Sequence, residues 1–223
     1  MTSMPLAIYK DLCIDVTEPA RMAAFWGSAL RLGVEHLPDG DARLVGDRPQ
    51  QTVWLNRVPE PKAVKHRTHL DVFTTAVTDL VALGARVLDD TSFGWTVLAD
   101  PEDGELCAFV RDNRVGLYEI GVDCVAHQAQ SAWWGDVLGA QVCDDGRGFS
   151  WLENVDGAPF DALVFCDVPE PKTVKNRIHL DFVVPDVAAL LAAGATMLRP
   201  KDDEIGWHVL ADPEGNEFCA FAP

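Results

Sequence analysis

Two histidines are each followed two positions later by an aspartate, at His69-Leu70-Asp71 and at His179-Leu180-Asp181. Side chains two positions apart in a β-strand lie on the same face, so each pair can touch. An aspartate so placed orients the imidazole ring or raises its pKa. We therefore interpret His69, His179 and Asp181 as candidate acid–base groups or polar ligand anchors. A purely structural His–Asp pair that closes the strand is the alternative.

Basic side chains gather just before each of these histidines. The six are Lys62, Lys65, Arg67, Lys172, Lys175 and Arg177. Two interpretations stand. Either the basic segments bind an anionic ligand, or they pair with acids such as Glu60 and Glu170 and hold the segment in place.

The elements that must position these residues follow from an internal repeat. Val58-Pro59-Glu60-Pro61-Lys62 returns as Val168-Pro169-Glu170-Pro171-Lys172, and the later Cys107-Ala108-Phe109 returns as Cys219-Ala220-Phe221. The unit is too long for a solenoid repeat. We therefore predict two tandem domains, at residues 1–112 and 113–223, and an internal pseudo-dimer that is a monomer in solution.

Each copy has the pattern strand, helix, three strands, twice over. In the first copy we expect strands at 9–16 and 68–73, and helices at 19–32 and 74–83. The matching helices of the second copy are expected at 128–138 and 186–193. The Asp-Pro-Glu segments before the last strands read as plain hairpin turns. Trp95 and Trp207 are expected to serve packing.

Composition narrows the classes of partner. The 223 residues carry a formal charge of −17, which repels nucleic acid and anionic membrane surfaces. No run of 18 apolar residues or secretory signal is evident, so we expect neither a membrane span nor export. The six cysteines form no Cys-x-x-Cys pair and most lie in apolar stretches. Reduced, buried thiols predict a cytoplasmic protein.

The repeated motifs resemble those of the vicinal oxygen chelate superfamily, which includes glyoxalase I, bleomycin-resistance proteins and extradiol dioxygenases. The likeness is carried by Val-Pro-Glu-Pro-Lys-x-Val-Lys-x-Arg-x-His-Leu-Asp at 168–181 and Gly-Trp-x-Val-x-Ala-Asp-Pro-Glu-Gly-Asn-Glu-Phe-Cys at 206–219, with looser versions at 58–71 and 94–107. The resemblance implies an α+β fold of tandem glyoxalase-like domains, each of two strand–helix–three-strand modules that form a half-open barrel around a cavity.

Metal-binding members of that superfamily place ligands on the first and last strands of paired modules. By resemblance, the positions in the first copy are Asp11, Asn56, His69 and Cys107. Those in the second copy are Glu119, Cys166, His179 and Cys219. Neither set has the ligands that glyoxalase or dioxygenase chemistry requires. We therefore expect no metal cofactor. If a divalent metal binds, the second set is expected to hold it.

These features favour a small-molecule binding protein with a metal-free cavity for an aromatic or hydrophobic ligand, as in the antibiotic-resistance members. The alternative is a lyase, isomerase or cyclase that uses a histidine or carboxylate as acid–base group. A structural or regulatory protein with filled cavities is a third possibility. Large aromatic residues that differ between the copies, or polar residues near the predicted cavity, are the candidate ligand-binding groups: Trp54, Trp133, Trp151, Glu119 and Asp11.

Overall fold

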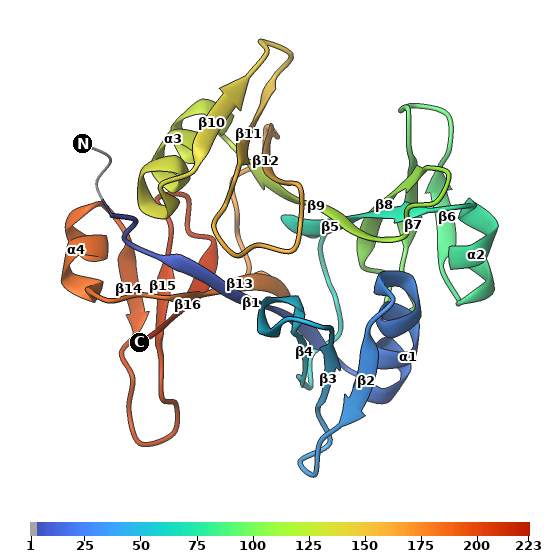
Figure 1. Cartoon of the computed structure of the whole chain (residues 1–223), viewed down its shortest axis with the longest axis horizontal. Helices are drawn as coiled ribbons and strands as arrows, with labels where there is room; N and C mark the ends of the chain where they lie inside the picture. The colour runs from blue at the N-terminus through green and yellow to red at the C-terminus, as the bar shows by residue number, and fades with distance from the viewer. Residues whose placement is uncertain (1–3) are drawn as a thin grey trace.

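The computed structural model describes residues 4–223, which form four modules of the predicted pattern (Figure 1). The first contains β1 (Ile8–Val16), α1 (Pro19–Leu30), β2 (Gly33–His36), β3 (Ala42–Val45), the short 3-10 helix η1 (Pro49–Gln51) and β4 (Val53–Arg57). The second contains β5 (Thr68–Thr74), α2 (Val77–Ala82), β6 (Arg86–Asp89), β7 (Thr96–Ala99) and β8 (Glu105–Val110).

The second copy repeats the pattern. Module three contains β9 (Gly116–Cys124), α3 (His127–Leu138), β10 (Gln141–Asp144), β11 (Phe149–Glu153) and β12 (Ala162–Asp167). Module four contains β13 (Ile178–Val183), α4 (Val187–Ala192), β14 (Thr196–Arg199), β15 (His208–Ala211) and β16 (Glu217–Phe221). The predicted α+β class and module order are confirmed. Helix α1 ends two residues earlier than predicted, because Arg31 adopts the left-handed conformation with φ of 56°.

The modules combine into two eight-stranded sheets. Sheet A has the order β14-β15-β16-β13-β1-β4-β3-β2, so it joins the first and fourth modules. Sheet B has the order β10-β11-β12-β9-β5-β8-β7-β6 and joins the third and second modules. Each sheet therefore takes one module from each copy. The repeat boundary near residue 112 does not separate the sheets, and the expected pairing of modules within a copy is corrected.

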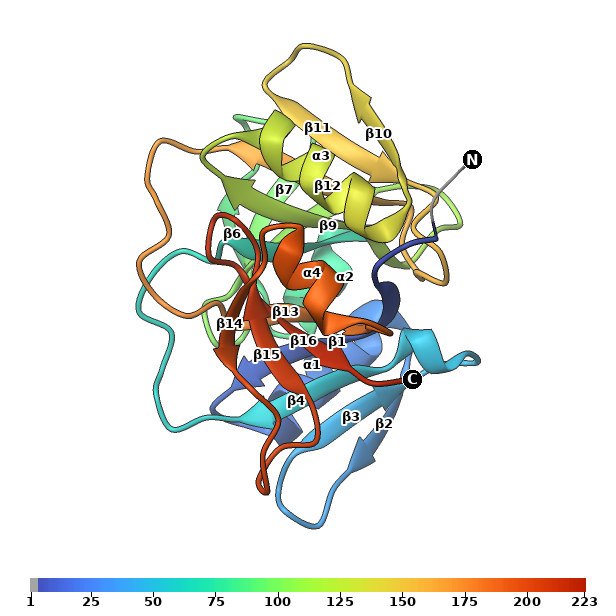
Figure 2. The ribbon, with the colours of Figure 1, turned by 90° about the vertical axis from the view of Figure 1, so that its left-hand side faces the viewer.

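Both sheets are open and strongly curved (Figures 1 and 2). Sheet A opens at the lower end of Figure 1 and sheet B at the upper end, so their concave faces point away from each other. Their convex sides and the helices share one continuous apolar core. Trp134 of α3 illustrates this sharing, because its ring packs on Phe182 and Phe218 of sheet A. No helix among residues 4–223 is long and apolar enough to cross a bilayer.

Two glutamates fasten the modules of each copy to each other. The Glu102 carboxylate accepts hydrogen bonds from the backbone N–H groups of Thr17 and Glu18, directly before α1. The Glu214 carboxylate likewise accepts from Val125 and Ala126, before α3. Each glutamate belongs to an Asp-Pro-Glu turn. These turns therefore do more than reverse the chain, because each supplies acceptors to free N–H groups at a helix start in the other module.

Removing either glutamate should destabilise the protein. We expect Glu102→Ala to lower the free energy of unfolding by about 1–3 kcal/mol, because two backbone N–H groups lose their hydrogen bonds to a charged carboxylate. The measurement is urea-induced unfolding followed by circular dichroism. Glu60→Ala is the matched control, because the Glu60 side chain is exposed. Equal midpoints for the two variants would contradict the proposed role of Glu102.

Candidate active sites on the concave faces

The central strands of sheet A place four polar side chains on its concave face. In the antiparallel pairing of β1 with β13, Cys13 lies opposite His179, and Asp11 lies opposite Asp181. A β-bulge between Tyr9 and Asp11 leaves the residue between them without a cross-strand partner and sets Asp11 opposite Asp181. Because cross-strand partners share a face, the four side chains gather at the floor of the curved sheet.

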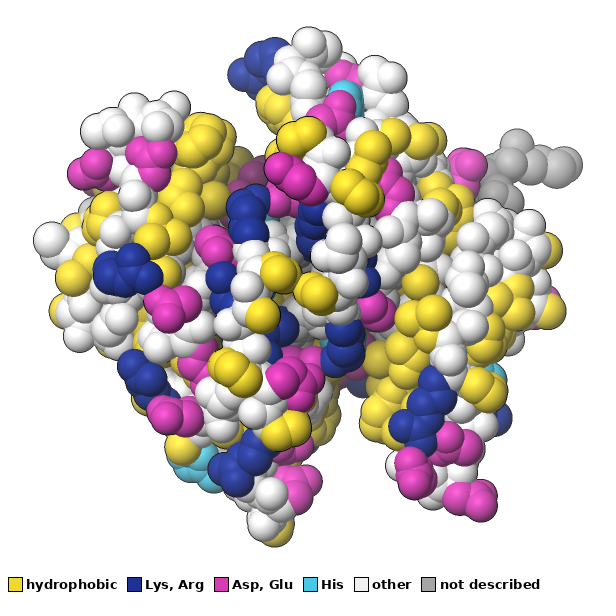
Figure 3. Space-filling model, turned by 180° about the vertical axis from the view of Figure 1, so that it is seen from behind, with side chains coloured by type: hydrophobic (Ala, Val, Ile, Leu, Met, Phe, Trp, Pro, Cys, Tyr) yellow, Lys and Arg dark blue, Asp and Glu magenta, His cyan; other side chains and the backbone are white. Residues whose placement is uncertain are grey.

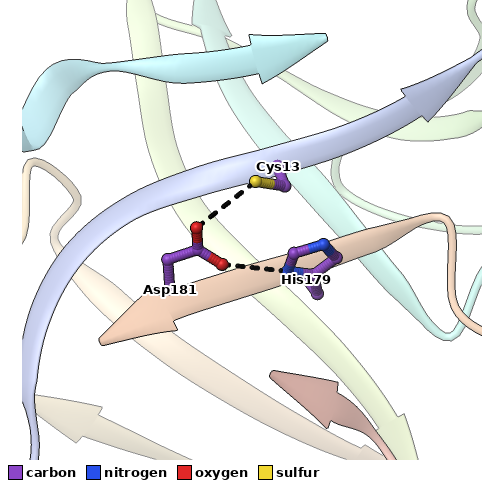
Figure 4. A group of neighbouring side chains, drawn as sticks. All are labelled: Cys13, His179 and Asp181. Carbon is purple, nitrogen blue, oxygen red and sulfur yellow. Dashed lines mark hydrogen bonds and ion pairs between the residues drawn. The ribbon is translucent and has the colours of Figure 1, made fainter. Parts of the chain in front are cut away.

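Cys13, His179 and Asp181 form a compact cluster (Figure 4). His179 Nδ1 lies 3.1 Å from Asp181 Oδ1, and the Cys13 thiol donates to Asp181 Oδ2 at 3.5 Å. The sulfur of Cys219, from β16, lies 3.9 Å from His179 Nδ1. The His179 and Asp181 side chains are only 11% and 4% exposed. The predicted contact between these two residues is therefore observed. Cys219, which the resemblance grouped with His179, lies beside the pair, and Cys13, which the sequence did not assign to this site, completes the cluster.

Burial determines the protonation of the thiols. It raises the pKa of Cys13 well above its usual value, and the neighbouring Asp181 carboxylate adds to this shift. Burial and Asp181 raise the pKa of Cys219 in the same direction. Both groups are therefore protonated at neutral pH in the metal-free protein. Asp181 Oδ1 is buried without a well-aligned hydrogen bond, so the cluster retains an unused acceptor.

Asp11 and Trp54 lie beside this cluster. The indole Nε1 of Trp54 donates to Asp11 Oδ2 at 3.1 Å, and Lys10 Nζ lies 2.6 Å from the same oxygen. Burial raises the pKa of Asp11, although the hydrogen bonds from Lys10 and Trp54 oppose the shift. The structure thus places the predicted ligand-binding residues Asp11 and Trp54 together on the concave face of sheet A.

Sheet B carries a related but different cluster. His69 Nε2 lies 3.4 Å from Asp71 Oδ1, and the Cys107 sulfur is within 4.8 Å of both. Burial lowers the pKa of His69, whereas burial and the nearby Glu119 raise the pKa of Asp71. Gly121 lies opposite His69, in the place that Cys13 takes opposite His179. The His69 ring lies over this glycine.

The conditional metal set predicted from the sequence is not brought together. Glu119 on β9 and Cys166 on β12 belong to sheet B, whereas His179 on β13 and Cys219 on β16 belong to sheet A. The set from the first copy is divided in the same way. The grouping was wrong because it assumed that the modules of one copy form one sheet.

The three predicted ligand-binding tryptophans separate. Trp151 faces the concave side of sheet B, across from Val164, and its Nε1 donates to Glu153. Trp133 lies elsewhere: its Nε1 donates to the backbone oxygen of Ala193, and its ring packs against Trp134 on the convex side of sheet A. Trp133 therefore does not lie with the other two tryptophans, because α3 turns this side chain towards module four, and the ligand-binding role predicted for it stays a prediction.

Other aromatic rings, expected only to pack, form a wall on each concave face. Trp207 stacks on Phe221 in sheet A, with 5.2 Å between ring centroids. Trp95 stacks on Phe109 in sheet B at 5.3 Å and remains 36% exposed. The spacing along the sequence could have placed two of these rings on the concave faces. Phe221 and Phe109 each lie two residues after a cluster cysteine, so they share its face.

The basic segments line a separate groove of about 780 Å³ between the linkers at 60–67 and 168–177. Lys and Arg side chains gather across the middle of this face (Figure 3). Their partners are carboxylates and backbone oxygens of both copies: Lys65 pairs with Asp123, Lys175 with Asp15, Lys62 with Glu105, Lys172 with Glu217, Arg67 with Glu170 O and Arg177 with Glu60 O. These contacts favour the interpretation that the basic segments hold the linkers.

Comparisons with known proteins agree with this fold. A model of the glyoxalase-like domain matches residues 11–109 and 119–221. Glyoxalase I from Zea mays is 15% identical with a TM-score of 0.69, over 96% of this chain and 92% of that chain. A putative dioxygenase from Bacillus subtilis is 11% identical with a TM-score of 0.64, over 99% of this chain and 86% of that chain. No curated protein sequence matches. At these identities the solved structures show a shared fold alone.

The place of the His69 ring depends on the missing side chain at position 121. A Cβ added to Gly121 would lie 2.4 Å from His69 Nε2, so Gly121→Ala must displace the ring. We expect a loss of about 1–3 kcal/mol of unfolding free energy, as for other overpacked sites. Denaturant unfolding measures it. Gly94→Ala is the control, because a Cβ there meets nothing within 4 Å. A Gly121→Ala variant as stable as the control would contradict the contact.

Proposed function

The chain belongs to the glyoxalase-like domain family, and from that premise we propose that it binds a flat, largely apolar or aromatic small molecule on its concave faces. One observation carries the proposal. Partly exposed aromatic rings flank a polar, buried floor on each face. Such a combination of apolar walls and few polar groups is typical of ligand sites.

On sheet A the two walls come from different modules. Trp54 stands on β4 of the first module, and the Trp207–Phe221 stack belongs to the fourth. None of these three rings is fully buried. The cluster around His179 lies on strands β1, β13 and β16 between them. A planar ligand inserted there would stack on both walls, and the His179–Asp181 pair would provide a polar anchor.

Sheet B supports the same proposal with other residues. Phe93 stacks on Trp95, with 5.0 Å between ring centroids, and is 52% exposed. A row of stacked aromatic rings therefore extends to the outer edge of this face. Trp151 and Phe149 lie on the opposite side, with ring centroids 5.7 Å apart. Aromatic surface that the protein itself leaves uncovered is the feature that a stacking ligand would bury.

Ligand binding should depend on the concave tryptophans and not on the convex one. We expect a Trp54→Leu and Trp151→Leu double variant, which removes one ring from each face, to bind 2-naphthamide at least fivefold more weakly than the original protein. The expected loss corresponds to about 1 kcal/mol from lost ring contacts. Isothermal titration calorimetry measures it. Trp133→Leu serves as the control. Equal affinity of the double variant and the control, or no binding at all, would refute the proposed function.

The cluster of Figure 4 favours a second candidate, a metal-dependent lyase or isomerase. A thiol, an imidazole and a carboxylate are donors that zinc accepts. One donor atom from each of Cys13, His179 and Asp181 lies within 4.8 Å of the other two. The unused Asp181 Oδ1 is a further point of fit. Cys13, His179 and Asp181 would hold the ion, which would supply Lewis-acid polarisation of a ligand oxygen.

Zinc titration separates the two candidates. If the second is correct, the protein binds about one Zn²⁺ per chain, and Cys13→Ser or His179→Ala weakens that binding at least tenfold. Elemental analysis and calorimetry measure both quantities. Cys107→Ser, in sheet B, is the matched control and should leave the strong site intact. Substoichiometric zinc would instead support the metal-free site expected from the sequence.

A further inference from the structure

Each concave face has a β-bulge at the same position of the repeat, and the two bulges carry different residues. Lys10 is the residue that the β1–β13 pairing skips, and Tyr118 is the residue that the β9–β5 pairing skips. The two positions are equivalent in the repeat. A β-bulge redirects the side chain of the extra residue and often lies beside a binding site. Each of these side chains packs on the aromatic wall of its own face.

The contacts of the two bulge residues are different in charge. Lys10 Nζ lies 4.3 Å from the centroid of the Phe221 ring, whereas the Tyr118 ring lies 5.1 Å from that of Phe109. Lys10 also contacts Asp11, which uses one of its three ammonium donors. Its side chain is 31% exposed, so further donors remain available to a ligand. Sheet A therefore has a cation on its wall where sheet B has a phenol.

The opposite wall repeats this difference. The Arg43 guanidinium lies 5.6 Å from the Trp54 ring centroid on sheet A, and Arg43 is paired with Trp54 across the strands. On sheet B the corresponding pair is Trp151 and Val164. Arg43 donates through Nε to Glu35 and is 39% exposed, which leaves its two Nη groups for another acceptor. Two cations thus flank sheet A at positions where sheet B has uncharged rings.

The remaining charges do not cancel this difference. Asp11 and Asp181 on sheet A are matched by Glu119 and Asp71 on sheet B, so the acids are equivalent in number at the floor. The lysines of the linkers are also equivalent, because Lys175 pairs with Asp15 and Lys65 with Asp123. Sheet B also has arginines on aromatic rings, but at other positions: Arg147 lies over Phe149 and Arg114 over Phe73. All four cations are paired with an acid, so the difference is one of exposure: the side chains of Arg147 and Arg114 are 70% and 53% exposed, against 31% for Lys10 and 39% for Arg43.

We propose that the concave face of sheet A selects an aromatic ligand that carries a carboxylate, and that sheet B takes an uncharged aromatic ligand. Lys10 and Arg43 determine the selection, since each has free N–H donors beside an aromatic ring on which the ligand would stack. The proposal rests on the proposed function and adds the ligand class of each face to it. A carboxylate accepts charge-assisted hydrogen bonds that an amide of the same shape cannot match.

The test compares 2-naphthoate with 2-naphthamide, which share shape but differ in charge. In calorimetry the original protein should bind one 2-naphthoate per chain at least tenfold more tightly than a Lys10→Gln and Arg43→Gln double variant does. The affinity of that variant for 2-naphthamide should change less than twofold. Raising the salt concentration should weaken the binding of 2-naphthoate and leave the binding of 2-naphthamide nearly unchanged.

A gain-of-function variant keeps the test independent of any loss of folding. Tyr118→Lys places a cation at the equivalent bulge of sheet B and should create a second 2-naphthoate site. Trp54→Leu in that variant should weaken 2-naphthoate binding only at the site on sheet A. If the double variant retained full 2-naphthoate affinity, or Tyr118→Lys gave no second site, charge selection would be refuted while 2-naphthamide binding still supported the proposed function. Failure of both probes to bind the original protein would overturn both proposals.

Discussion

The candidate sites depend on one constraint, the antiparallel pairing of first strands that come from different copies of the repeat. Pairing of β1 with β13 sets Cys13 opposite His179, and pairing of β5 with β9 sets His69 opposite Gly121. A slip of one residue would turn these side chains to the convex face, where they would meet the apolar core. The bulge in each pair preserves this alignment and also directs one more side chain towards the wall.

Several contacts hold this pairing in place. The sheets connect modules of different copies, while Glu102 and Glu214 connect the two modules of the same copy. The four modules therefore form a closed ring of contacts. The linkers add a reciprocal pair of hydrogen bonds, in which Arg67 and Arg177 each donate to a backbone oxygen of the opposite linker. Each half alone would leave its central strands without their partners, and an unpaired strand edge is a liability.

The duplication has produced two sites with the same frame and different chemistry. In sheet A a thiol faces the histidine, whereas in sheet B a glycine allows the ring to lie against the backbone. The imidazole nitrogen that meets the aspartate consequently differs, being Nδ1 in His179 and Nε2 in His69. Substitution at one strand position thus changes the donor set without any change in the sheet, and the equivalent sites need not serve the same ligand.

Local pattern was sufficient for much of this structure. The repeat, the order of strands and helices within each module, the α+β class and the contact within each His-x-Asp pair all follow from spacing along the chain, because neighbours in a strand have a fixed geometry. The family resemblance follows from the repeated motifs and is confirmed.

Only the tertiary structure decided which modules share a sheet. Periodicity identifies a strand and its buried face, but the backbone of that strand can form its hydrogen bonds equally well with the edge strand of any of several modules. The predicted metal set therefore mixed residues of two sheets, and Cys13 became a site residue only through its register with His179. The place of Trp133 depended on the same choice, because the cross-copy arrangement puts α3 beside module four. The sequence by itself determined the modules and their chemically distinctive residues, and the long-range pairing of the modules decided which residues meet.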